Sequence, residues 1–440
     1  MKSSFKTSLP YSDKVGPLEE DIKKFRQEYS LLWWETDTDA PRFEKTYSES
    51  EQIKIEKEFT GYVDEVSDKF EDYPTDKEKQ KEWLGKFIDG IKKFGEKTFR
   101  LSDLYLDSIS QEGFINSTRA FVDKVKEFHP SLKIENVYQA LRNVWIMNSL
   151  QMYLNIDIKP SDAIFAYSMI YPYTDNYLDD VTQSFEKKLS FNSKLKNWLE
   201  GQLTSPSNKQ EEKIFRLIKM IENQYSRDKF PDVYRGLLAI FNAQIKSLIL
   251  QKKQSIPYEI NILDISFEKG GTSVLTDGLL VNGNLNKEQA AFCFGFGLML
   301  QLSDDIQDVS QDMKNNHMTV FSQTAQKYNL DALANKLFNF ISRIVDLKLS
   351  EEISSQKCLK ELILKNCYYL VLESIGKNQN FYSQEYIEKT CRHFPFRFSY
   401  LKQLRKRLNQ LLLEKRKYVA DLDLISAVLL TITSRTISGK

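Results

Sequence analysis

Three aspartates spaced four residues apart are the strongest sign of chemistry in this 440-residue chain. They are Asp304, Asp308 and Asp312, and on an α-helix this spacing would place their carboxylates along one stripe, about 6 Å of rise apart. Residues 290–299, just before them, are apolar on every side and predict a buried helix. A buried helix that ends in carboxylates needs cations, because unpaired buried charge is costly. A Mg²⁺ site at the mouth of an apolar cavity meets that need; an acidic helix end facing water is the alternative.

A second acidic stretch favours the metal site. Asp175 and Asp179 are again four residues apart, and they follow the apolar run 163–170. Two apolar helices that both end in carboxylates predict facing walls of one pocket with metal between their rims. Mg²⁺ prefers oxygen ligands and is commonly held by a few carboxylates together with substrate phosphates. Asp180 and Asp305, each one 100° step off its stripe, are reserve ligands.

These two motifs resemble those of the class I isoprenoid synthases, which include trans-prenyl diphosphate synthases, squalene/phytoene synthases and terpene cyclases. Residues 296–309 are similar to the second metal motif of prenyl diphosphate synthases. Lys269, within 268–273, lies where that family carries a diphosphate-binding Lys-Thr, and His317 stands in place of the Lys in its Lys-x-Thr. The resemblance covers roughly residues 140–330. It implies an all-α helical bundle around a central cavity.

The resemblance also implies a Mg²⁺ cofactor, with three ions, and an allylic prenyl diphosphate substrate. The carboxylates expected to be catalytic and to ligate the metal are Asp175, Asp179, Asp304, Asp308 and Asp312, with Asp180 and Asp305 in reserve. The residues expected to bind diphosphate are Lys269, Arg235 and His317. The residues expected to line the cavity, one to three turns above the metal ligands, are Ile164, Ser168, Tyr171, Cys293, Gly297 and Leu300. Gly297 is expected to keep its helix slim and so to tolerate a larger side chain.

Differences between this sequence and the family's motifs favour one of the family's reactions over the others. A chain-elongating synthase needs a second basic pocket for isopentenyl diphosphate, and the early core segment 140–145 has a single Arg142 and no basic run. Asn176 occupies a position where many elongases have a second Asp, and the phrase 175–179 is reminiscent of bacterial large-terpene synthases. The signatures of squalene/phytoene-type enzymes are not found. The sequence therefore favours a terpene synthase, a lyase acting on diphosphates. A chain-elongating prenyltransferase and a catalytically silent helical scaffold remain as alternatives.

The composition limits which partners and which cellular compartment are expected. Lys and Arg number 62 and Asp and Glu 61, so the formal charge of +1 gives no global field for nucleic acid. Four cysteines without metal or disulfide spacing are consistent with a reducing compartment. No signal peptide is read at the N-terminus, and no apolar run reaches the ~18 residues of a membrane span. These features predict a cytoplasmic protein. The basic runs 405–407 and 415–417 are expected to be solvated, with peripheral membrane contact as the alternative, and a homodimer stays open.

Helices must position these groups, because 11 prolines and 16 glycines are few for this length and helical spacing is widespread. Residues 1–50 read as an irregular arm anchored by Trp33-Trp34, followed by three amphipathic helices over 48–128. Ser161 is expected to cap the first metal helix and Pro172 to kink it. Gly270-Gly271 is expected to interrupt a later helix. Further helices are predicted over 137–153, 232–252, 330–349, 356–375, 383–393 and 398–434. We divide the chain into an N-terminal arm and helical extension, 1–130, and a synthase domain, 131–440.

Overall fold

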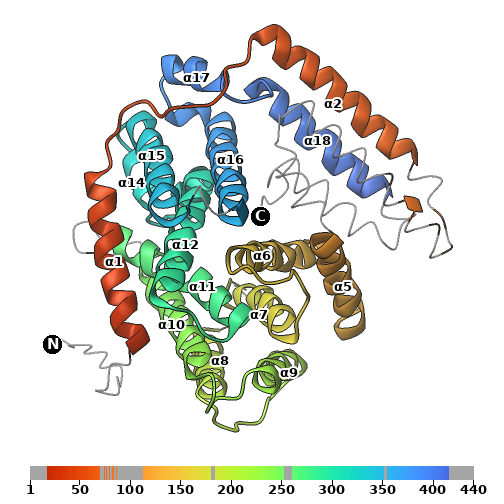
Figure 1. The fold of residues 1–440 in the computed structure, drawn as a ribbon, viewed down its shortest axis with the longest axis vertical. Helices are drawn as coiled ribbons and strands as arrows, with labels where there is room; N and C mark the ends of the chain where they lie inside the picture. Colours follow the sequence, from red (N-terminus) through yellow and green to blue (C-terminus); the bar gives the residue numbers. More distant parts are fainter. Residues whose placement is uncertain are drawn as a thin grey trace.

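The computed structural model describes residues 17–69, 112–179, 184–251, 260–350 and 354–415, with isolated positions between 74 and 86. Every regular element in these ranges is a helix, and none of them is a strand (Figure 1). The predicted all-α class is therefore confirmed. Within the same ranges, no helix is both long enough and apolar enough to cross a bilayer.

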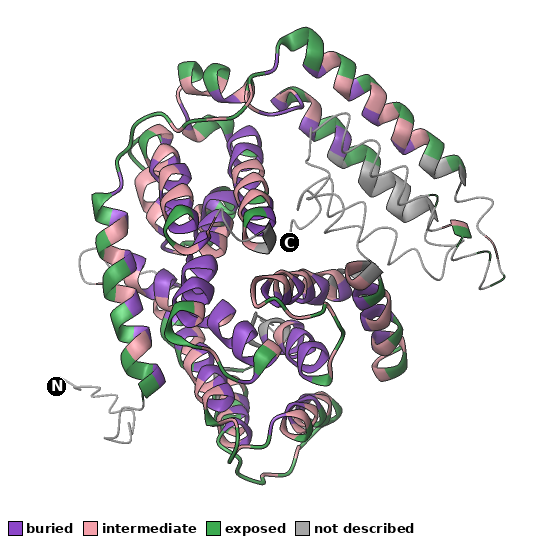
Figure 2. Cartoon of the chain, in the orientation of Figure 1, coloured by how far each residue is buried: buried purple, intermediate pink, exposed green. Residues whose placement is uncertain are grey.

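Two antiparallel helices form the centre of the molecule. They are α11 (Ile262–Asn282) and α12 (Lys287–Gln307), and most of their residues are buried (Figure 2). Gly283, at φ 80°, ends α11 in a conformation that favours glycine. Asn286 and Gln289 then form a reciprocal capping box that starts α12. A tight, well-capped turn thus sets the two helices side by side.

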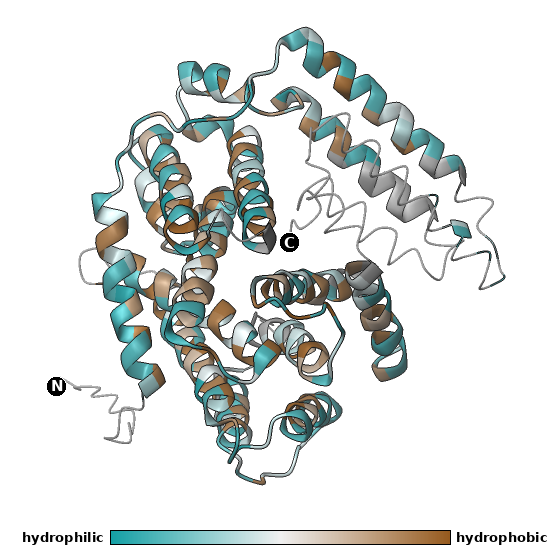
Figure 3. Cartoon of the chain, viewed as in Figure 1, coloured by the Kyte–Doolittle hydropathy of each residue, from teal (hydrophilic) through white to brown (hydrophobic). Residues whose placement is uncertain are grey.

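Other helices surround this pair. Those that contact α11 or α12 are α1 (Pro17–Glu35), α6 (Ile134–Tyr153), α7 (Asp162–Asp179), α10 (Pro231–Ser247), α13 (Val309–Asn315), α14 (Val320–Ala325), α15 (Asp331–Lys348) and α16 (Ser354–Lys377). The remaining elements are α2 (Glu49–Lys69), α5 (Glu112–Phe128), α8 (Phe185–Leu199), α9 (Lys209–Gln224), η1 (Leu248–Gln251), η2 (Gln379–Phe381), α17 (Gln384–Cys391) and α18 (Phe398–Lys415). Figure 3 shows mainly hydrophilic residues along the peripheral α2.

The N-terminal segment differs from its prediction as an irregular arm, because residues 17–35 form the regular helix α1. Trp33 is buried in the main core and lies edge-on to Phe340, with 5.1 Å between ring centroids. The Tyr29 hydroxyl donates to the Ala291 carbonyl at 2.7 Å, which ties α1 to α12. Trp33 is therefore an anchor, whereas Trp34 is 70% exposed.

Most of the other predicted helices are present with shifted ends. The Ser161 hydroxyl accepts the Ile164 N–H at 3.2 Å as the expected cap of α7, and Pro172 lies inside that helix. The expected middle helix of the 48–128 region and the tail after Lys415 lie largely or wholly outside the described residues. The boundary between 130 and 131 stays a prediction, although α1 shares the main hydrophobic core.

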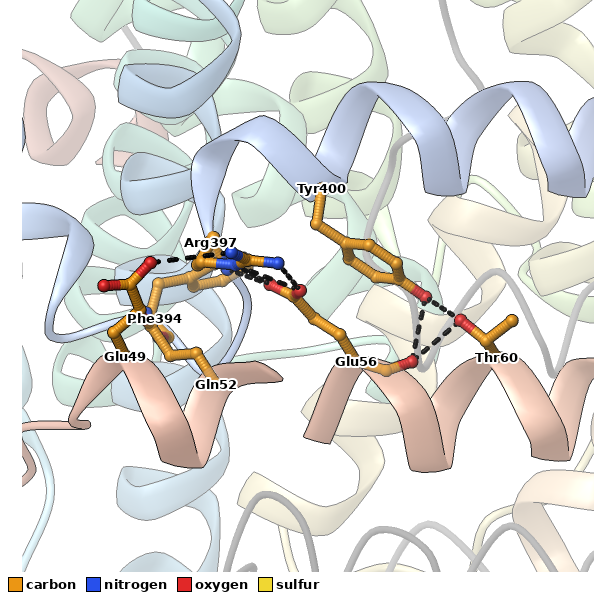
Figure 4. A network of polar contacts seen from close by, with 7 residues as sticks. All are labelled: Glu49, Gln52, Glu56, Thr60, Phe394, Arg397 and Tyr400. Carbon is orange, nitrogen blue, oxygen red and sulfur yellow. Dashed lines mark hydrogen bonds and ion pairs between the residues drawn. The ribbon is translucent and has the colours of Figure 1, made fainter. Parts of the chain in front are cut away.

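A buried ion pair joins α2 to α18 (Figure 4). Glu56 is 4% exposed, and its carboxylate accepts hydrogen bonds from the Arg397 guanidinium at 2.7 Å and from the Arg397 backbone N–H, also at 2.7 Å. Beside it, the hydroxyls of Thr60 and Tyr400 are 2.7 Å apart. The Gln52 side-chain amide donates to two backbone carbonyls just before α18, each at 2.8 Å. These contacts fix an N-terminal helix on a C-terminal one.

We expect Glu56→Gln to lower the free energy of unfolding by about 1–3 kcal/mol, because it removes the buried carboxylate that accepts the Arg397 guanidinium and backbone N–H. Glu49→Gln is the matched control: Glu49 also faces Arg397, but at 3.6 Å and with its side chain 75% exposed. It should change stability by less than about 0.5 kcal/mol. Urea unfolding measures both variants. Equal losses of unfolding free energy in the two variants would contradict the assignment of Glu56 as the buried partner of Arg397.

Candidate active site

The helices that carry the two acidic motifs run in the same direction. At one end of α6, Tyr153 lies against Phe292 in the first half of α12, with ring centroids 4.0 Å apart. Eleven residues earlier, in the middle of α6, Arg142 lies close enough to Asp308, just after α12, for its charge to lower the pKa of that carboxyl. So α6 is antiparallel to α12, and it is also antiparallel to α7, which follows it through the short connection 154–161. The acidic ends of α7 and α12 therefore lie at the same end of the bundle.

This end of the bundle concentrates negative charge. The C-terminus of each helix carries the negative end of its macrodipole, so carboxylates there need cations nearby. Asp175 and Asp179 belong to the last turns of α7, but their side chains lie outside the description, as does the whole of Asp180. The geometry that follows is therefore that of the α12 side of the site.

The three-aspartate stripe is not on one uninterrupted helix. Asp308, at φ −96° and ψ 10°, separates α12 from α13, so Asp312 belongs to the second of these helices. The hydrogen-bond spacing nevertheless continues: the Asp308 N–H donates to the Asp304 carbonyl at 2.9 Å, and the Asp312 N–H to the Asp308 carbonyl at 2.8 Å. The expectation of one continuous helix is thus wrong at Asp308, while the four-residue spacing is kept.

The Asp308 carboxylate is 53% exposed and lies 3.8 Å from the Lys377 ammonium at the end of α16. Its partial burial raises its pKa, and the charges of Asp304 and Asp312 raise it further. Lys377 and Arg142 act in the opposite direction. Burial contributes most to this rise, and the repulsion from Asp304 and Asp312 adds more to it than Lys377 and Arg142 take away.

Asp305 is the buried member of the group. Its Oδ1 accepts the Gln301 amide at 2.8 Å, while no hydrogen-bond partner for its Oδ2 is found among the described residues. Burial raises the pKa of Asp305 to about 7, and the charge of Asp312 adds to the rise, whereas Lys269 and His317 oppose it. The Nδ1 of His317 lies 3.3 Å from Asp312 Oδ1. Lys269 and His317 thus lie within electrostatic reach of Asp305, and their binding of diphosphate stays a prediction.

Arg235, the other predicted diphosphate ligand, lies elsewhere. Its guanidinium pairs with Asp232 at 2.8 Å, on the first turns of α10. The neighbouring Gly236 packs against Thr276, since a Cβ on it would lie 3.3 Å from the Thr276 hydroxyl. Thr276 is seven residues after Lys269, about 10 Å further along α11. The structure therefore does not bring Arg235 to Lys269.

The predicted cavity residues fall into two groups. Ile164, Ser168 and Cys293 are buried, while Tyr171 and Leu300 are half-buried. Burial is compatible with a cavity wall and equally with close packing, so their lining role stays a prediction.

The structure contradicts the prediction that Gly297 lines the cavity. A Cβ at this position would lie 2.0 Å from the Gly270 carbonyl oxygen and 3.0 Å from the Gly271 Cα. Gly297 therefore faces the backbone of α11 and cannot line a cavity. The same contact corrects a second expectation: α11 runs without interruption through Gly270 and Gly271, which are small because α12 approaches closely there.

Some polar residues near this end were missed by the sequence reasoning. Asp277 is completely buried on α11, and Asn143 donates to it from α6 at 3.0 Å. A single acid inside the apolar run 274–281 was the available signal. Lys377 could not have been found locally, since it comes from a helix some seventy residues away along the chain.

The donors on the α12 side suit a hard cation. They are carboxylate oxygens, and one of them, Asp305 Oδ2, is buried without a hydrogen-bond partner in the described ranges. Within those ranges, no three His, Cys, Asp or Glu side chains are grouped so as to hold a metal ion by themselves. A Mg²⁺ site would therefore need carboxylates from the α7 side, or the substrate, to complete it.

Comparison with known proteins adds little. No family model matches the chain, and no curated protein does. A crystal structure of geranylgeranyl pyrophosphate synthase aligns with 72% of this chain and 98% of its own length, at 14% identity and a TM-score of 0.29. A similarity this low carries no weight for fold or function.

We expect Gly297→Ala to lower the free energy of unfolding by about 2–3 kcal/mol, because its methyl group would collide with the α11 backbone. Gly61→Ala is the matched control, since an added Cβ there meets nothing within 4 Å on the exposed side of α2. It should raise stability by about 0.5–1 kcal/mol. Thermal unfolding of both purified variants checks the sign. A fully stable Gly297→Ala variant would restore Gly297 as a cavity position.

Proposed function

We propose that this protein is a Mg²⁺-dependent class I terpene synthase. It ionises an allylic prenyl diphosphate and converts the resulting cation to a terpene hydrocarbon or alcohol. The metal ligands would come from Asp175 and Asp179 on one side and from Asp304, Asp308 and Asp312 on the other, with Asp180 and Asp305 as further candidates.

One observation carries the proposal. Two apolar helices run in parallel and end in carboxylates at the same end of the bundle, and Lys269 lies there within electrostatic reach of the buried Asp305. A packed core gains nothing from such a concentration of acids at helix C-termini. A site that binds cations together with an anion does, because the bound charges compensate one another.

When bound, Mg²⁺ would supply Lewis-acid stabilisation to the diphosphate as it leaves. The protein's own residues do the rest. Lys269 and His317 bind diphosphate oxygens beside Asp305 and Asp312, and Arg142 and Lys377 partly offset the negative charge around Asp308. The apolar residues of α7 and α12 keep bulk water from the cation, and aromatic faces can stabilise it without reacting.

The purified enzyme should convert one allylic diphosphate, offered singly as the C15, C20 or C25 compound with Mg²⁺, to an extractable hydrocarbon or alcohol. Isopentenyl diphosphate should not be required, because chain elongation joins two diphosphates and needs a second anion site. Gas chromatography of the organic extract, with and without isopentenyl diphosphate, makes the measurement. A longer prenyl diphosphate that forms only when isopentenyl diphosphate is supplied would replace the cyclase assignment by a prenyltransferase.

Asp308→Asn should lower turnover by at least about 100-fold, as loss of a group that stabilises developing charge commonly does. It should leave the metal-free melting temperature unchanged or slightly higher, because Asp304 and Asp312 already disfavour the charged form of Asp308. Mg²⁺ with inorganic pyrophosphate should raise the melting temperature of the wild type and not of this variant.

Asp228→Asn, in the exposed loop between α9 and α10, is the control and should behave as the wild type. A wild type that neither turns over substrate nor responds to Mg²⁺ and pyrophosphate would favour a catalytically silent scaffold. A marked fall in the metal-free melting temperature of Asp308→Asn would argue against a metal site.

A further inference from the structure

A polar cluster lies inside the apolar interior at the junction of α6, α7 and α11. Asp277 and Ser168 both have exposed fractions of 0%. The Asn143 side-chain amide donates to Asp277 Oδ1 at 3.0 Å and lies 3.3 Å from the Ser168 hydroxyl. Three helices thus contribute one polar group each, two of them fully buried and Asn143 half-buried.

The cluster leaves one oxygen of Asp277 without a partner. No hydrogen-bond donor for Asp277 Oδ2 is found among the described residues. Leaving a buried acceptor unsatisfied costs about 1–3 kcal/mol, and replacing such a group by an apolar residue is often neutral or stabilising. Packing alone therefore does not explain Asp277. Burial raises its pKa to about 8, which favours the neutral acid at pH 7 and makes its anionic form a stronger proton acceptor than the carboxylate of an ordinary aspartate.

The position of the cluster relates it to the carboxylate end. Ser168 precedes Asp175 by seven residues, two turns, and so shares its face of α7. Asp277 follows Lys269 by eight residues, about 12 Å along α11. Cys293 of α12 lies beside it, since the charge of Asp277 raises the pKa of that thiol. The cluster is thus two turns deeper than the diphosphate end, where the hydrocarbon part of a substrate would extend.

We propose that Asp277, oriented by Asn143, binds through Oδ2 the water molecule that captures the allylic carbocation and then accepts its proton. This inference rests on the proposed function. In the step, the water oxygen forms a C–O bond to the cationic carbon, one water O–H bond breaks, and its proton passes to the Asp277 carboxylate. The product is an alcohol, and the proton returns to solvent when the product leaves. Ser168 offers the water a second hydrogen bond.

The test compares products rather than total activity. Wild-type enzyme with a C15, C20 or C25 allylic diphosphate in ¹⁸O-labelled water should give an alcohol that carries the label. Asp277→Leu, of similar size but unable to accept a proton, should lower the ratio of alcohol to hydrocarbon by at least about tenfold, since positioned proton acceptors contribute at least that much. Asp277→Asn, which is nearly isosteric, should shift the ratio in the same direction and serves if Asp277→Leu does not fold.

Thr276→Val is the matched control. Thr276 is the preceding residue, equally buried, but its hydroxyl donates to the Gly236 carbonyl at 2.9 Å on the side of α10. Its product ratio should equal that of the wild type. This inference would be overturned if the wild type made only hydrocarbon or an unlabelled alcohol. It would also be overturned if a folded Asp277 variant kept the wild-type alcohol fraction. Each of these results would leave the proposed function standing. Failure of the wild type to convert any allylic diphosphate would overturn both the role of Asp277 and the proposed function.

Discussion

The close approach of α11 to α12 is the contact on which the site depends. Gly270 and Gly297 meet so tightly that a Cβ on Gly297 would lie 2.0 Å from the Gly270 carbonyl oxygen. This distance places Lys269, next to Gly270, within electrostatic reach of Asp305, because Gln301 and Asp305 follow Gly297 at intervals of one turn. Side chains at the crossing would push the helices apart and separate cation from carboxylate. Gly270, Gly271 and Gly297 therefore affect the electrostatics of the site without contacting a ligand.

The second constraint is unbalanced charge. Asp304, Asp308 and the buried Asp305 lie at the C-terminal end of α12. Burial raises the pKa values of Asp305 and Asp308, and the charges of neighbouring aspartates raise them further. Lys269 and Lys377 lower these values but do not cancel the rise. Such an arrangement lowers stability while empty of ligand and gains free energy when cations bind, which is the expected trade between stability and function at a binding site.

The sequence predicted the helices better than their contacts. Periodicity located α6 and α15 to within a few residues, and the acidic motifs fall at the ends of α7 and α12, while their joint metal site stays a prediction. It failed where a residue's role depends on a distant partner. Gly270-Gly271 looked like a helix break because local propensity is unfavourable, yet tertiary packing against Gly297 overrides it. The miss at α1 has a different cause. The breaks at 9–10 and 37–41 led to the prediction of an irregular arm, although Leu18, Ile22, Phe25, Tyr29 and Trp33 between them already have the helical spacing that α1 buries.

The remaining question is why two kinds of carboxylate occur on neighbouring helices of the same bundle. At the C-terminal end of α12, Asp308 is half exposed and surrounded by charges of both signs, which suits an ionised ligand for a cation. Two turns deeper, Asp277 is fully buried with one hydrogen-bond donor, which favours its neutral form and makes its anion a strong base. Environments that separate the pKa values of similar groups also separate their roles. On this reasoning the outer carboxylates hold charge in place, while the inner one can move a proton, and the depth of each follows from the turns of α11 and α12 that carry them.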